Sequence, residues 1–421
     1  MKICVVALGK AGLPLAVQCA RKGHDVIGVD IKAAVVDSVN AGIAPFPGEP
    51  ELPELLAQAV MAGNLRASTD TSAAVATSEV VLVVVPVVVD ADGAPDFGAI
   101  DAATRDIAIS VCPGTLVSYE TTLPLGTTRN RFGPMLGSDL YLVHSPERVF
   151  TGRIFADLRR YPKLLGGVDE PSAKKGIEFY EAVLDFDPRP DLARPNGVWD
   201  LGSAEAAELA KLAETSYRDV NIGLANEFAR YAQTTGVNIF TVIEAANSQP
   251  FSHIHQPGAA VGGHCIPVYP HFYLSGDPQA TIVRVARACN ASQPAHIVRL
   301  LGALLHNMSG SKVAVMGASY RAGVKEHAYS GVFPIVHELC VAGATPVVHD
   351  PLYTDEELVG LGLIPYHVGD PVDAVIVHTD HAEYADLAAE HFPGIRALLD
   401  GRYITRPELW PGVQREVFGV G

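Results

Sequence analysis

The N-terminal segment constrains the fold more than any other part of the chain, because strand and helix signals alternate within a short distance. An apolar run over residues 2–7 (KICVVA) has the composition of a buried strand. A turn containing Gly9 and Gly12 follows, and a helical pattern then extends to about Lys22. A second apolar run covers residues 25–30. This order predicts a β–α–β unit of about thirty residues with two parallel strands.

The same alternation continues along the chain and returns near its C-terminal end. Apolar runs predict further strands in two series, over residues 80–85, 115–119 and 140–143, and then over 312–317, 345–350 and 373–378. Strands that are separated by helices pair in parallel, so each series predicts a doubly wound sheet. We therefore expect an α/β protein with two Rossmann-like doubly wound domains.

A long helical stretch lies between the two series. Residues 203–235 are rich in alanine and leucine and contain few helix breakers. They predict one helix of roughly thirty residues, which is well above the usual length. A helix of this kind can join two domains and pack against a second subunit. A segment rich in Gly, Pro and His follows over residues 247–270, and more helix is expected to about Asn307.

The overall charge and composition exclude some classes of partner. The formal net charge is −16, whereas a protein that binds nucleic acid needs a basic surface. The longest apolar run, Val80–Val89, has about half the length that a membrane-spanning helix requires. Without a convincing signal peptide, we expect a cytoplasmic protein with no membrane partner. The six cysteines lack paired spacing, which predicts free thiols and no metal site.

The turn after the first strand carries a dinucleotide-binding pattern. Gly9 and Gly12 belong to a G-x-G-x-x-G pattern whose first position is Ala7. Such a turn brings backbone close to a pyrophosphate at a helix N-terminus, whose dipole favours an anion. Asp30 ends the second strand, where a carboxylate binds ribose hydroxyls and disfavours a 2′-phosphate. The pattern predicts NAD as cofactor, with an ordinary strand–helix turn as the alternative.

The run Val261-Gly262-Gly263-His264-Cys265-Ile266-Pro267 places a thiol directly after two glycines and a histidine. An arbitrary cysteine is more often a small buried hydrophobic residue than a nucleophile. The glycines, however, allow backbone to approach a ligand, and a thiol becomes nucleophilic where its thiolate is stabilised. Cys265 is therefore a candidate nucleophile. His264 either donates to an anionic ligand or fills space.

Other polar residues stand where a site is expected. Lys211, beside the apolar Leu212 on the long helix, either points into a cleft or lies on a solvated face. Glu147 follows a predicted strand, where α/β sheets place their ligands, so it is a candidate base or a surface charge. Asn226 and Glu227 are either buried polar groups or an ordinary exposed pair.

In their order along the whole chain, these motifs resemble the UDP-glucose/GDP-mannose dehydrogenase family of nucleotide-sugar 6-dehydrogenases. The resemblance is carried by Gly9-Lys10-Ala11-Gly12-Leu13-Pro14-Leu15-Ala16, Thr121-Thr122-Leu123-Pro124-Leu125-Gly126-Thr127-Thr128, Ser145-Pro146-Glu147, Lys211, Asn226-Glu227, Gly262-Gly263-His264-Cys265, Asp350-Pro351, Thr379-Asp380-His381 and Asp400-Gly401-Arg402.

The resemblance implies an enzyme that oxidises the C6 alcohol of a nucleotide sugar to a carboxylate and reduces two NAD per turnover. It also implies three domains and a homodimer formed through the central helix. The expected domains are an NAD-binding Rossmann domain over residues 1–200, a central helical dimerisation region with the catalytic Cys loop over 201–305, and a Rossmann-like domain that binds the UDP of the nucleotide sugar over 306–421.

Position within the motifs implies a catalytic role for four residues. Cys265 matches the nucleophile that attacks the C6 aldehyde to give a thiohemiacetal and later a thioester. Lys211 matches a lysine that stabilises the developing alkoxide. Glu147 matches the general base of thioester hydrolysis, and Thr122 a polar residue near the reacting water. The expected cofactor contacts are Gly9, Ala11, Gly12, Leu13, Asp30, Pro86 and Thr122, and the expected substrate contacts are Glu147, Arg148, Lys211, Gly258, Gly262, Gly263, His264 and Arg321.

The chain also departs from the family pattern. Tyr269 stands where the family usually has Asp, and Thr215 where it usually has Asn. The Gly-Gly-His-Cys run resembles members that act on UDP-N-acetylhexosamines or GDP-mannose, while UDP-glucose stays open as the substrate. Two other functions remain as alternatives. One is a β-hydroxyacid dehydrogenase, which needs neither Cys265 nor a second nucleotide domain, and the other is a non-catalytic nucleotide-sugar binder.

Overall fold

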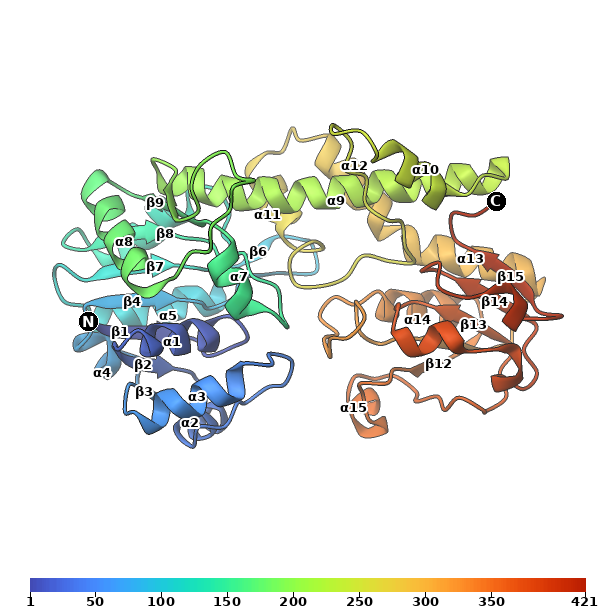
Figure 1. Cartoon of the computed structure of the whole chain (residues 1–421), viewed down its shortest axis with the longest axis horizontal. Coiled ribbons are helices and arrows are strands. Elements are labelled where there is room, and N and C mark those ends of the chain that lie inside the picture. The colour runs from blue at the N-terminus through green and yellow to red at the C-terminus, as the bar shows by residue number, and fades with distance from the viewer. The chain divides into compact units, whose positions relative to one another are not determined.

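The computed structural model describes all 421 residues and divides them into two compact units (Figure 1). The first unit comprises residues 1–214 and 271–278, and the second comprises residues 215–270 and 279–421. Two helices contribute residues to both units, namely α9 (Ala204–Thr235) and α11 (Tyr269–Gly276). The predicted helix over 203–235 is α9, and it is continuous over its 32 residues.

The sheet of the first unit has the strand order of a Rossmann fold along most of its width. Its strands are β1 (Lys2–Val6), β2 (Asp25–Val29), β3 (Leu65–Ser68), β4 (Val80–Val83), β7 (Leu116–Tyr119), β8 (Tyr141–His144), β9 (Lys163–Gly167) and β10 (Val198–Asp200). Six of them are parallel in the order β3-β2-β1-β4-β7-β8. The order reverses between β1 and β4, so the carboxyl ends of these two strands form the expected ligand crevice.

The outer edge of this sheet differs from the all-parallel expectation. Strand β9 pairs antiparallel with β8, through Val143 opposite Gly167, and β10 then runs parallel to β9. The chain between β8 and β9 contains only the short helix α7 (Ile154–Arg160). This connection brings β9 back alongside β8 in the opposite direction.

Helices cover both faces of the first sheet, and a small hairpin adds to it. Helices α1 and α8 share one face, where the Gln18 side-chain amide donates to the Val183 carbonyl at 2.9 Å. The helices are α1 (Gly12–Arg21), α2 (Ala33–Asn40), α3 (Leu52–Met61), α4 (Thr71–Ala76), α5 (Gly98–Ser110), α6 (Gly133–Leu136) and α8 (Glu170–Val183), and the hairpin strands are β5 (Val88–Val89) and β6 (Pro95–Asp96).

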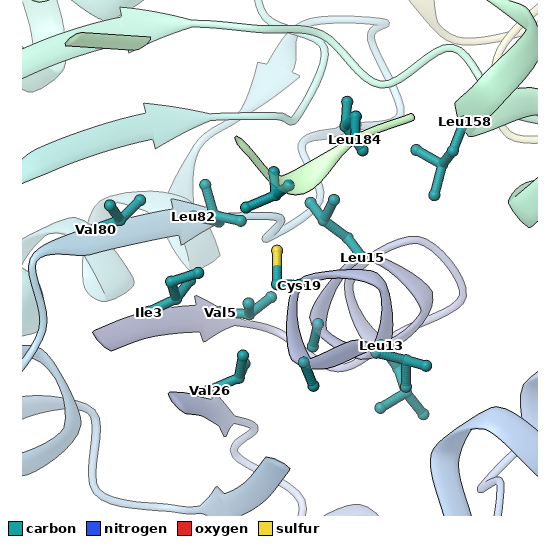
Figure 2. Close-up of a cluster of buried hydrophobic side chains, with 14 of the residues drawn as sticks. Ile3, Val5, Leu13, Leu15, Cys19, Val26, Val80, Leu82, Leu158 and Leu184 are labelled. Atoms are coloured by element: carbon teal, nitrogen blue, oxygen red, sulfur yellow. The ribbon is translucent and has the colours of Figure 1, made fainter. Parts of the chain in front are cut away.

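The core of the first unit lies between its sheet and helix α1. Figure 2 shows Ile3 and Val5 of β1 beside Leu82 of β4, with Leu15 and Cys19 of α1 directed toward the strands. All five side chains are at most 1% exposed. Burial of this apolar surface stabilises the sheet by roughly 25 cal/mol per Å². Because the strands are buried on both faces, they are nearly continuous apolar runs, which is why their positions could be predicted from the sequence.

The second unit contains a five-stranded parallel sheet in the order β12-β11-β13-β14-β15. This is the order of flavodoxin-like folds, which reverses between β11 and β13. Its strands are β11 (Lys312–Met316), β12 (Thr345–His349), β13 (Ala374–Val377), β14 (Ala397–Asp400) and β15 (Gln414–Val417), and its helices, besides α9, are α10 (Ile239–Ala246), α12 (Ile282–Ala291), α13 (Gln293–Leu305), α14 (Val332–Val341) and α15 (Asp355–Gly360). Both doubly wound sheets of the predicted fold are therefore present. None of the helices in the chain combines the length and apolarity needed to cross a bilayer.

The turn between β1 and α1 depends on a very close backbone approach. A Cβ atom on Gly12 would lie 2.0 Å from the carbonyl oxygen of Ala7, so only glycine fits there. Ala7 itself has a φ of 78°, a left-handed conformation that costs a residue with a Cβ atom about 1–2 kcal/mol. The alanine in the first position of the glycine pattern is therefore tolerated at the cost of backbone strain.

Helix α9 is attached to the first unit by a buried carboxylate. Glu208 is fully buried and accepts hydrogen bonds from the backbone N–H of Gly126, the N–H of Thr128 at 2.8 Å and the Thr128 hydroxyl at 2.7 Å. These donors belong to the start of a short π-helical turn, Thr128–Phe132. Burial raises the pKa of Glu208 from 4.5 to about 7, although the hydrogen bonds from Thr128 and Gly126 oppose this shift.

Substitution of Ala7 by glycine should stabilise the protein, because glycine adopts positive φ without a steric cost. We expect Ala7→Gly to increase the free energy of unfolding by about 1 kcal/mol, measured by denaturant titration. The matched control is Ala57→Gly at an exposed position of α3. There the same change should destabilise by about 0.5–1 kcal/mol. Destabilisation by both substitutions would contradict the assignment of strain to Ala7.

The stability contributed by Glu208 should decrease as the pH rises. Its pKa is higher in the folded than in the unfolded state, so its contribution is complete below about pH 4.5 and is lost as the pH rises through about 7. Relative to Glu208→Gln, the native protein should lose at most about 3 kcal/mol across this interval, measured by unfolding at several pH values.

Glu205→Gln on the same helix is the control with the opposite sign. A hydrogen bond from Arg129 lowers the pKa of Glu205, so its contribution is present at neutral pH and is lost on acidification. If both variants showed the same pH dependence relative to the native protein, the assignment of the Glu208 shift to burial would be wrong.

Candidate active site

The β1–α1 turn has the features that a dinucleotide requires. A Cβ atom on Gly9 would meet no atom within 4 Å, so the space over this peptide is open. Helix α1 begins after Ala11 without a side-chain cap, which leaves its N-terminal dipole available to an anion. Leu13 is buried and fixes the turn through its N–H, which donates to the Gly9 carbonyl at 3.0 Å. These residues fit the pyrophosphate of NAD.

The predicted ribose ligand, Asp30, also stabilises the turn. One of its carboxylate oxygens accepts from the Leu8 N–H at 3.0 Å, and the other accepts from the Lys32 N–H at 2.9 Å. Asp30 is half-buried. These bonds hold the carboxylate at the end of β2, beside the turn that the pyrophosphate would occupy.

Thr122 and Glu147 follow neighbouring strands of the first sheet. Thr122 comes after β7 and is buried, and Glu147 comes after β8 and is half-buried. The Glu147 N–H donates to the Glu120 carbonyl at 2.9 Å, which joins the two strand ends. The Thr121 hydroxyl donates to the Val85 carbonyl at 2.7 Å, which brings the end of β4 and the exposed Pro86 into the same region. These predicted residues therefore share the carboxyl edge of one sheet.

Helix α9 supplies the predicted lysine. Lys211 is 6% exposed and lies one helical turn after Glu208, so its side chain is not on a solvated face. Further along the helix, Asn226 is fully buried, whereas Glu227 is exposed. Of the two residues that could not be assigned from sequence, Asn226 is the buried polar group and Glu227 is an ordinary surface charge.

The loop that carries Cys265 is fixed at its start by amide side chains. The N–H of Gly258 donates to the Asn226 side-chain oxygen at 3.0 Å, and the Gly258 carbonyl accepts from the Gln293 side chain at 3.0 Å. Asn226 also donates to Asn290 at 3.1 Å. Two amide side chains, from α9 and α13, therefore hold Gly258, and a third, from α12, holds Asn226 in place.

The two glycines before His264 are required by packing inside the second unit. A Cβ atom on Gly262 would lie 2.6 Å from Cβ of Tyr320, and Gly263 has a φ of 98° with its peptide packed on the Tyr320 ring. The Gly263 N–H donates to the Ala328 carbonyl at 2.9 Å. The exposed imidazole of His264 lies 3.4 Å from a carboxylate oxygen of Glu326. The sequence suggested that the glycines allow approach to a ligand, and the structure shows that they first allow the loop to dock on this unit.

A buried ion pair holds the other end of the loop. The Arg287 guanidinium donates to the Ile266 carbonyl at 3.1 Å and lies 3.0 Å from the Asp219 carboxylate. Asp219 accepts a further bond from Asn290 at 2.8 Å. Cys265, which is half-buried, directly precedes Ile266. Neither Arg287 nor Asp219 is among the site residues predicted from the sequence.

The second sheet presents a polar edge at its point of strand reversal. Asp350, after β12, accepts bonds at 2.8 Å from the N–H groups of both Ala318 and Ser319 and is paired with His381 at 3.2 Å. Burial opposes ionisation, but the hydrogen bonds from His381 and the backbone lower the pKa of Asp350 to about 2. Arg321, a predicted substrate ligand, lies with Ala318 and Ser319 in the loop after β11. Its guanidinium donates to the Tyr320 hydroxyl at 3.2 Å.

The Cys265 loop lies against this edge. A Cβ atom on Gly331 would lie 2.1 Å from Cβ of Ala260, and one on Gly401 would lie 2.6 Å from Cβ of Ala259. Arg402 pairs with Asp380 at 2.9 Å close to Gly258. The second unit therefore brings together Gly258, Gly262, Gly263, His264, Cys265 and Arg321, whereas the first unit contains Thr122, Glu147, Arg148, Lys211 and the dinucleotide turn.

Three domains of one protein family match the chain in order. They are described as the UDP-glucose/GDP-mannose dehydrogenase family NAD binding domain, which matches residues 1–184, the central domain, which matches 205–292, and the UDP binding domain, which matches 314–407.

Individual relatives align with nearly the whole chain. A UDP-N-acetyl-D-mannosamine dehydrogenase of Pyrococcus horikoshii is 34% identical, with 96% of each chain covered. An NDP-N-acetyl-D-galactosaminuronic acid dehydrogenase of Ralstonia nicotianae is 31% identical, with 95% of each covered. The solved structure of a UDP-D-ManNAc dehydrogenase from Pyrococcus horikoshii superimposes with a TM-score of 0.88 at 31% identity, over 100% of both chains. With these matches and its NAD binding domain, the chain belongs to the UDP-glucose/GDP-mannose dehydrogenase family of NAD-dependent nucleotide-sugar dehydrogenases.

Proposed function

We propose that this enzyme oxidises the C6 hydroxyl of a UDP-hexose to the uronate in a four-electron reaction with Cys265 as covalent nucleophile. The observation that carries the proposal is that the Cys265 loop packs against the carboxyl ends of the strands in the parallel sheet of the second unit. This is the edge where doubly wound sheets bind nucleotides. The loop is fixed at Gly258 and at Ile266 by buried polar side chains. A thiol held at this edge can react with a sugar whose nucleotide occupies the crevice.

The protein groups have separate tasks in this scheme. NAD would be held at the Gly9–Gly12 turn, and each of the two NAD molecules used per turnover would supply the acceptor for one hydride. Lys211 stabilises the negative charge that develops on the C6 oxygen. After the C6 alcohol has lost a hydride and, to solvent, its hydroxyl proton to become the aldehyde, the Cys265 thiol adds across the C6 carbonyl to give a thiohemiacetal. The thiohemiacetal loses a second hydride and its hydroxyl proton to become a thioester. Glu147 takes a proton from a water molecule near Thr122, which attacks the thioester and releases the uronate and the thiol.

The substrate contacts follow from the same edge. The proposed contacts on the second unit are Gly258, Gly262, Gly263 and His264 of the Cys265 loop together with Arg321, and those on the first unit are Glu147 and Arg148. The relatives at 34% and 31% identity are named as dehydrogenases of nucleotide-linked N-acetylated sugars. We therefore favour a UDP-N-acetylhexosamine as substrate, with N-acetylmannosamine as the first sugar to test and UDP-glucose as the alternative.

Product stoichiometry tests the covalent scheme. With NAD and a panel of UDP-hexoses, the native enzyme should form two NADH per sugar and release a uronate, measured by absorbance and mass spectrometry. Cys265→Ala should lower uronate formation at least about a thousandfold, because no thioester can form. The matched control is Cys340→Ala, which removes an exposed thiol of the second unit and should leave the reaction unchanged.

The other outcomes distinguish the alternatives. Normal uronate formation by Cys265→Ala would rule out the covalent scheme. One NADH per substrate with indifference to that substitution would indicate a β-hydroxyacid dehydrogenase. Tight UDP-sugar binding without any NADH would indicate a binding protein.

We also propose that the enzyme is a homodimer formed through helices of the second unit. Large apolar side chains are exposed at helical spacing on α9 and continue on α12, which crosses α9 where Gly223 packs on Ala286. They are Tyr217, Leu224, Phe228, Tyr231, Ile282 and Val285. A contiguous apolar face of this kind is uncommon on a monomer and fits a second copy of the chain.

Charge introduced into this face should separate the subunits. We expect Val285→Asp, at a position that is 66% exposed, to convert a dimer into monomers in analytical ultracentrifugation. The matched control is Val341→Asp at the end of α14, where the valine is 71% exposed, and this variant should remain dimeric. A native protein that sediments as a monomer would refute the proposal.

A further inference from the structure

A lysine is buried behind the predicted general base. Lys163 lies on β9, and its side chain is 6% exposed. Its ammonium group is paired with the Glu120 carboxylate, donates to the Ser145 carbonyl at 3.3 Å and lies 3.7 Å from Oε2 of Glu147. One ammonium group is therefore shared between two carboxylates that follow adjacent strands.

The first carboxylate of this cluster is held from two sides. Glu120 is 1% exposed. One of its oxygens accepts from Lys163 and the other accepts from the Tyr180 hydroxyl, which is also bonded to Ser118 at 2.6 Å. Burial raises the pKa of Glu120, whereas the Lys163 ammonium and the hydrogen bonds from Lys163 and Tyr180 lower it.

Glu147 is oriented between backbone donors and this lysine. Its Oε1 atom accepts from the N–H groups of Arg148 at 2.6 Å and Val149 at 3.2 Å, and its Oε2 atom faces Lys163. Burial alone would favour a neutral amine, but the Glu120 and Glu147 carboxylates raise the pKa of Lys163, so it stays charged.

The other ionisable groups around the cluster do not supply a competing charge. Burial lowers the pKa of His144, on β8, to about 3, with Lys163 contributing, so its ring is neutral. Burial raises the pKa of Tyr180, on α8, and that of the Cys19 thiol, on α1, so both keep their protons. The Arg148 guanidinium is engaged by Glu214 of α9 at 2.9 Å. Asp157 lines a small surface pocket together with Glu147, and its carboxylate pairs with Arg153 at 3.1 Å.

We propose that Lys163 and Glu120 form a positioning pair that orients Glu147 for its role as base. Lys163 attracts the Glu147 carboxylate, and Glu120 limits this attraction because it shares the same ammonium group. The inference rests on the proposed function of Glu147. The fold alone does not require the pair, because apolar replacements of a buried ion pair are often neutral or stabilising.

Two substitutions should move the pH dependence in opposite directions. Lys163→Met removes the attraction, so the acidic limb of the kcat profile should move to higher pH by about one to three pH units. Glu120→Gln removes a competing negative charge, so the same limb should move to lower pH. Loss of structure cannot produce shifts of opposite sign. Arg131→Met, which breaks the surface pair with Asp101, is the matched control and should leave the profile in place.

A second measurement does not depend on turnover. Near neutral pH, the infrared spectrum of Lys163→Met should contain protonated carboxyl bands from both Glu120 and Glu147, and the Glu147 component should disappear when Glu147→Gln is added. If Lys163→Met does not fold, the proposal is tested by Glu120→Gln alone, whose acidic limb of the kcat profile should lie at lower pH than that of the native enzyme. Unchanged limbs in both variants of an active enzyme, or a carboxyl band that is insensitive to Glu147→Gln, would overturn the positioning pair. Failure of the native enzyme to form uronate would refute the proposed function, and the infrared result would then decide on the pair by itself.

Discussion

Buried polar side chains on one face of helix α9 fix the rotation of the helix about its own axis. This rotation decides which residues of α9 are buried beside the predicted site residues of each unit. Glu208 and Asp219 are fully buried and are separated by about three helical turns, so they lie on the same face. Glu208 bonds to the Thr128 turn in the first unit, and Asp219 pairs with Arg287 in the second. A buried carboxylate without these partners would be costly, so each pair fixes the rotation of the helix against its own unit.

This rotation sets the environment of the polar residues between and beyond the two carboxylates. Lys211 follows Glu208 by three residues and is buried, and Thr215, which stands where the family usually has Asn, is 2% exposed. Asn226 lies seven residues after Asp219, on the same face, and bonds to Gly258 at the start of the Cys265 loop. The buried stripe of α9 therefore contributes Glu208 and Lys211 to the first unit and Asp219 and Asn226 to the second. The opposite, apolar stripe through Phe228 is the one that we assign to the dimer.

The parts of the fold that could be predicted are those whose signal is local. The β1–α1–β2 unit and helix α9 were predicted from apolar runs and the lack of helix breakers, and they are confirmed. The direction of β9 could not be predicted, because an apolar strand such as Lys163–Gly167 has the same pattern in either direction. Its pairing is decided by the chain connection through α7 and by packing against α8.

The lack of a local signal also explains which site residues could not be predicted from the sequence. Glu147 was predicted because it follows a strand, where α/β sheets bind ligands, and Thr122 was predicted from the family resemblance alone. Glu120 directly follows strand β7 and Lys163 is the first residue of β9, and charged residues of this kind are usually exposed. Only the tertiary structure shows that they are buried against each other. For α9, a signal was present but was not used: Glu208, Thr215, Asp219 and Asn226 recur at intervals of seven, four and seven residues, the spacing of a buried helix face.

The burial and contacts of the six cysteine thiols distinguish Cys265 from the other five as a candidate nucleophile. Burial raises the pKa of Cys4 to about 12 and that of Cys19 further, so both stay protonated in the core of the first sheet. Cys112 and Cys340 are exposed. Cys289 is half-buried on α12, where its sulfur contacts the Gly223 carbonyl at 3.7 Å. Cys265 differs from all of these because the loop is held on both sides of it, at Gly263 by the Ala328 carbonyl and at Ile266 by the Arg287 guanidinium. A covalent mechanism needs a thiol that is accessible and yet fixed, and that combination occurs at this position.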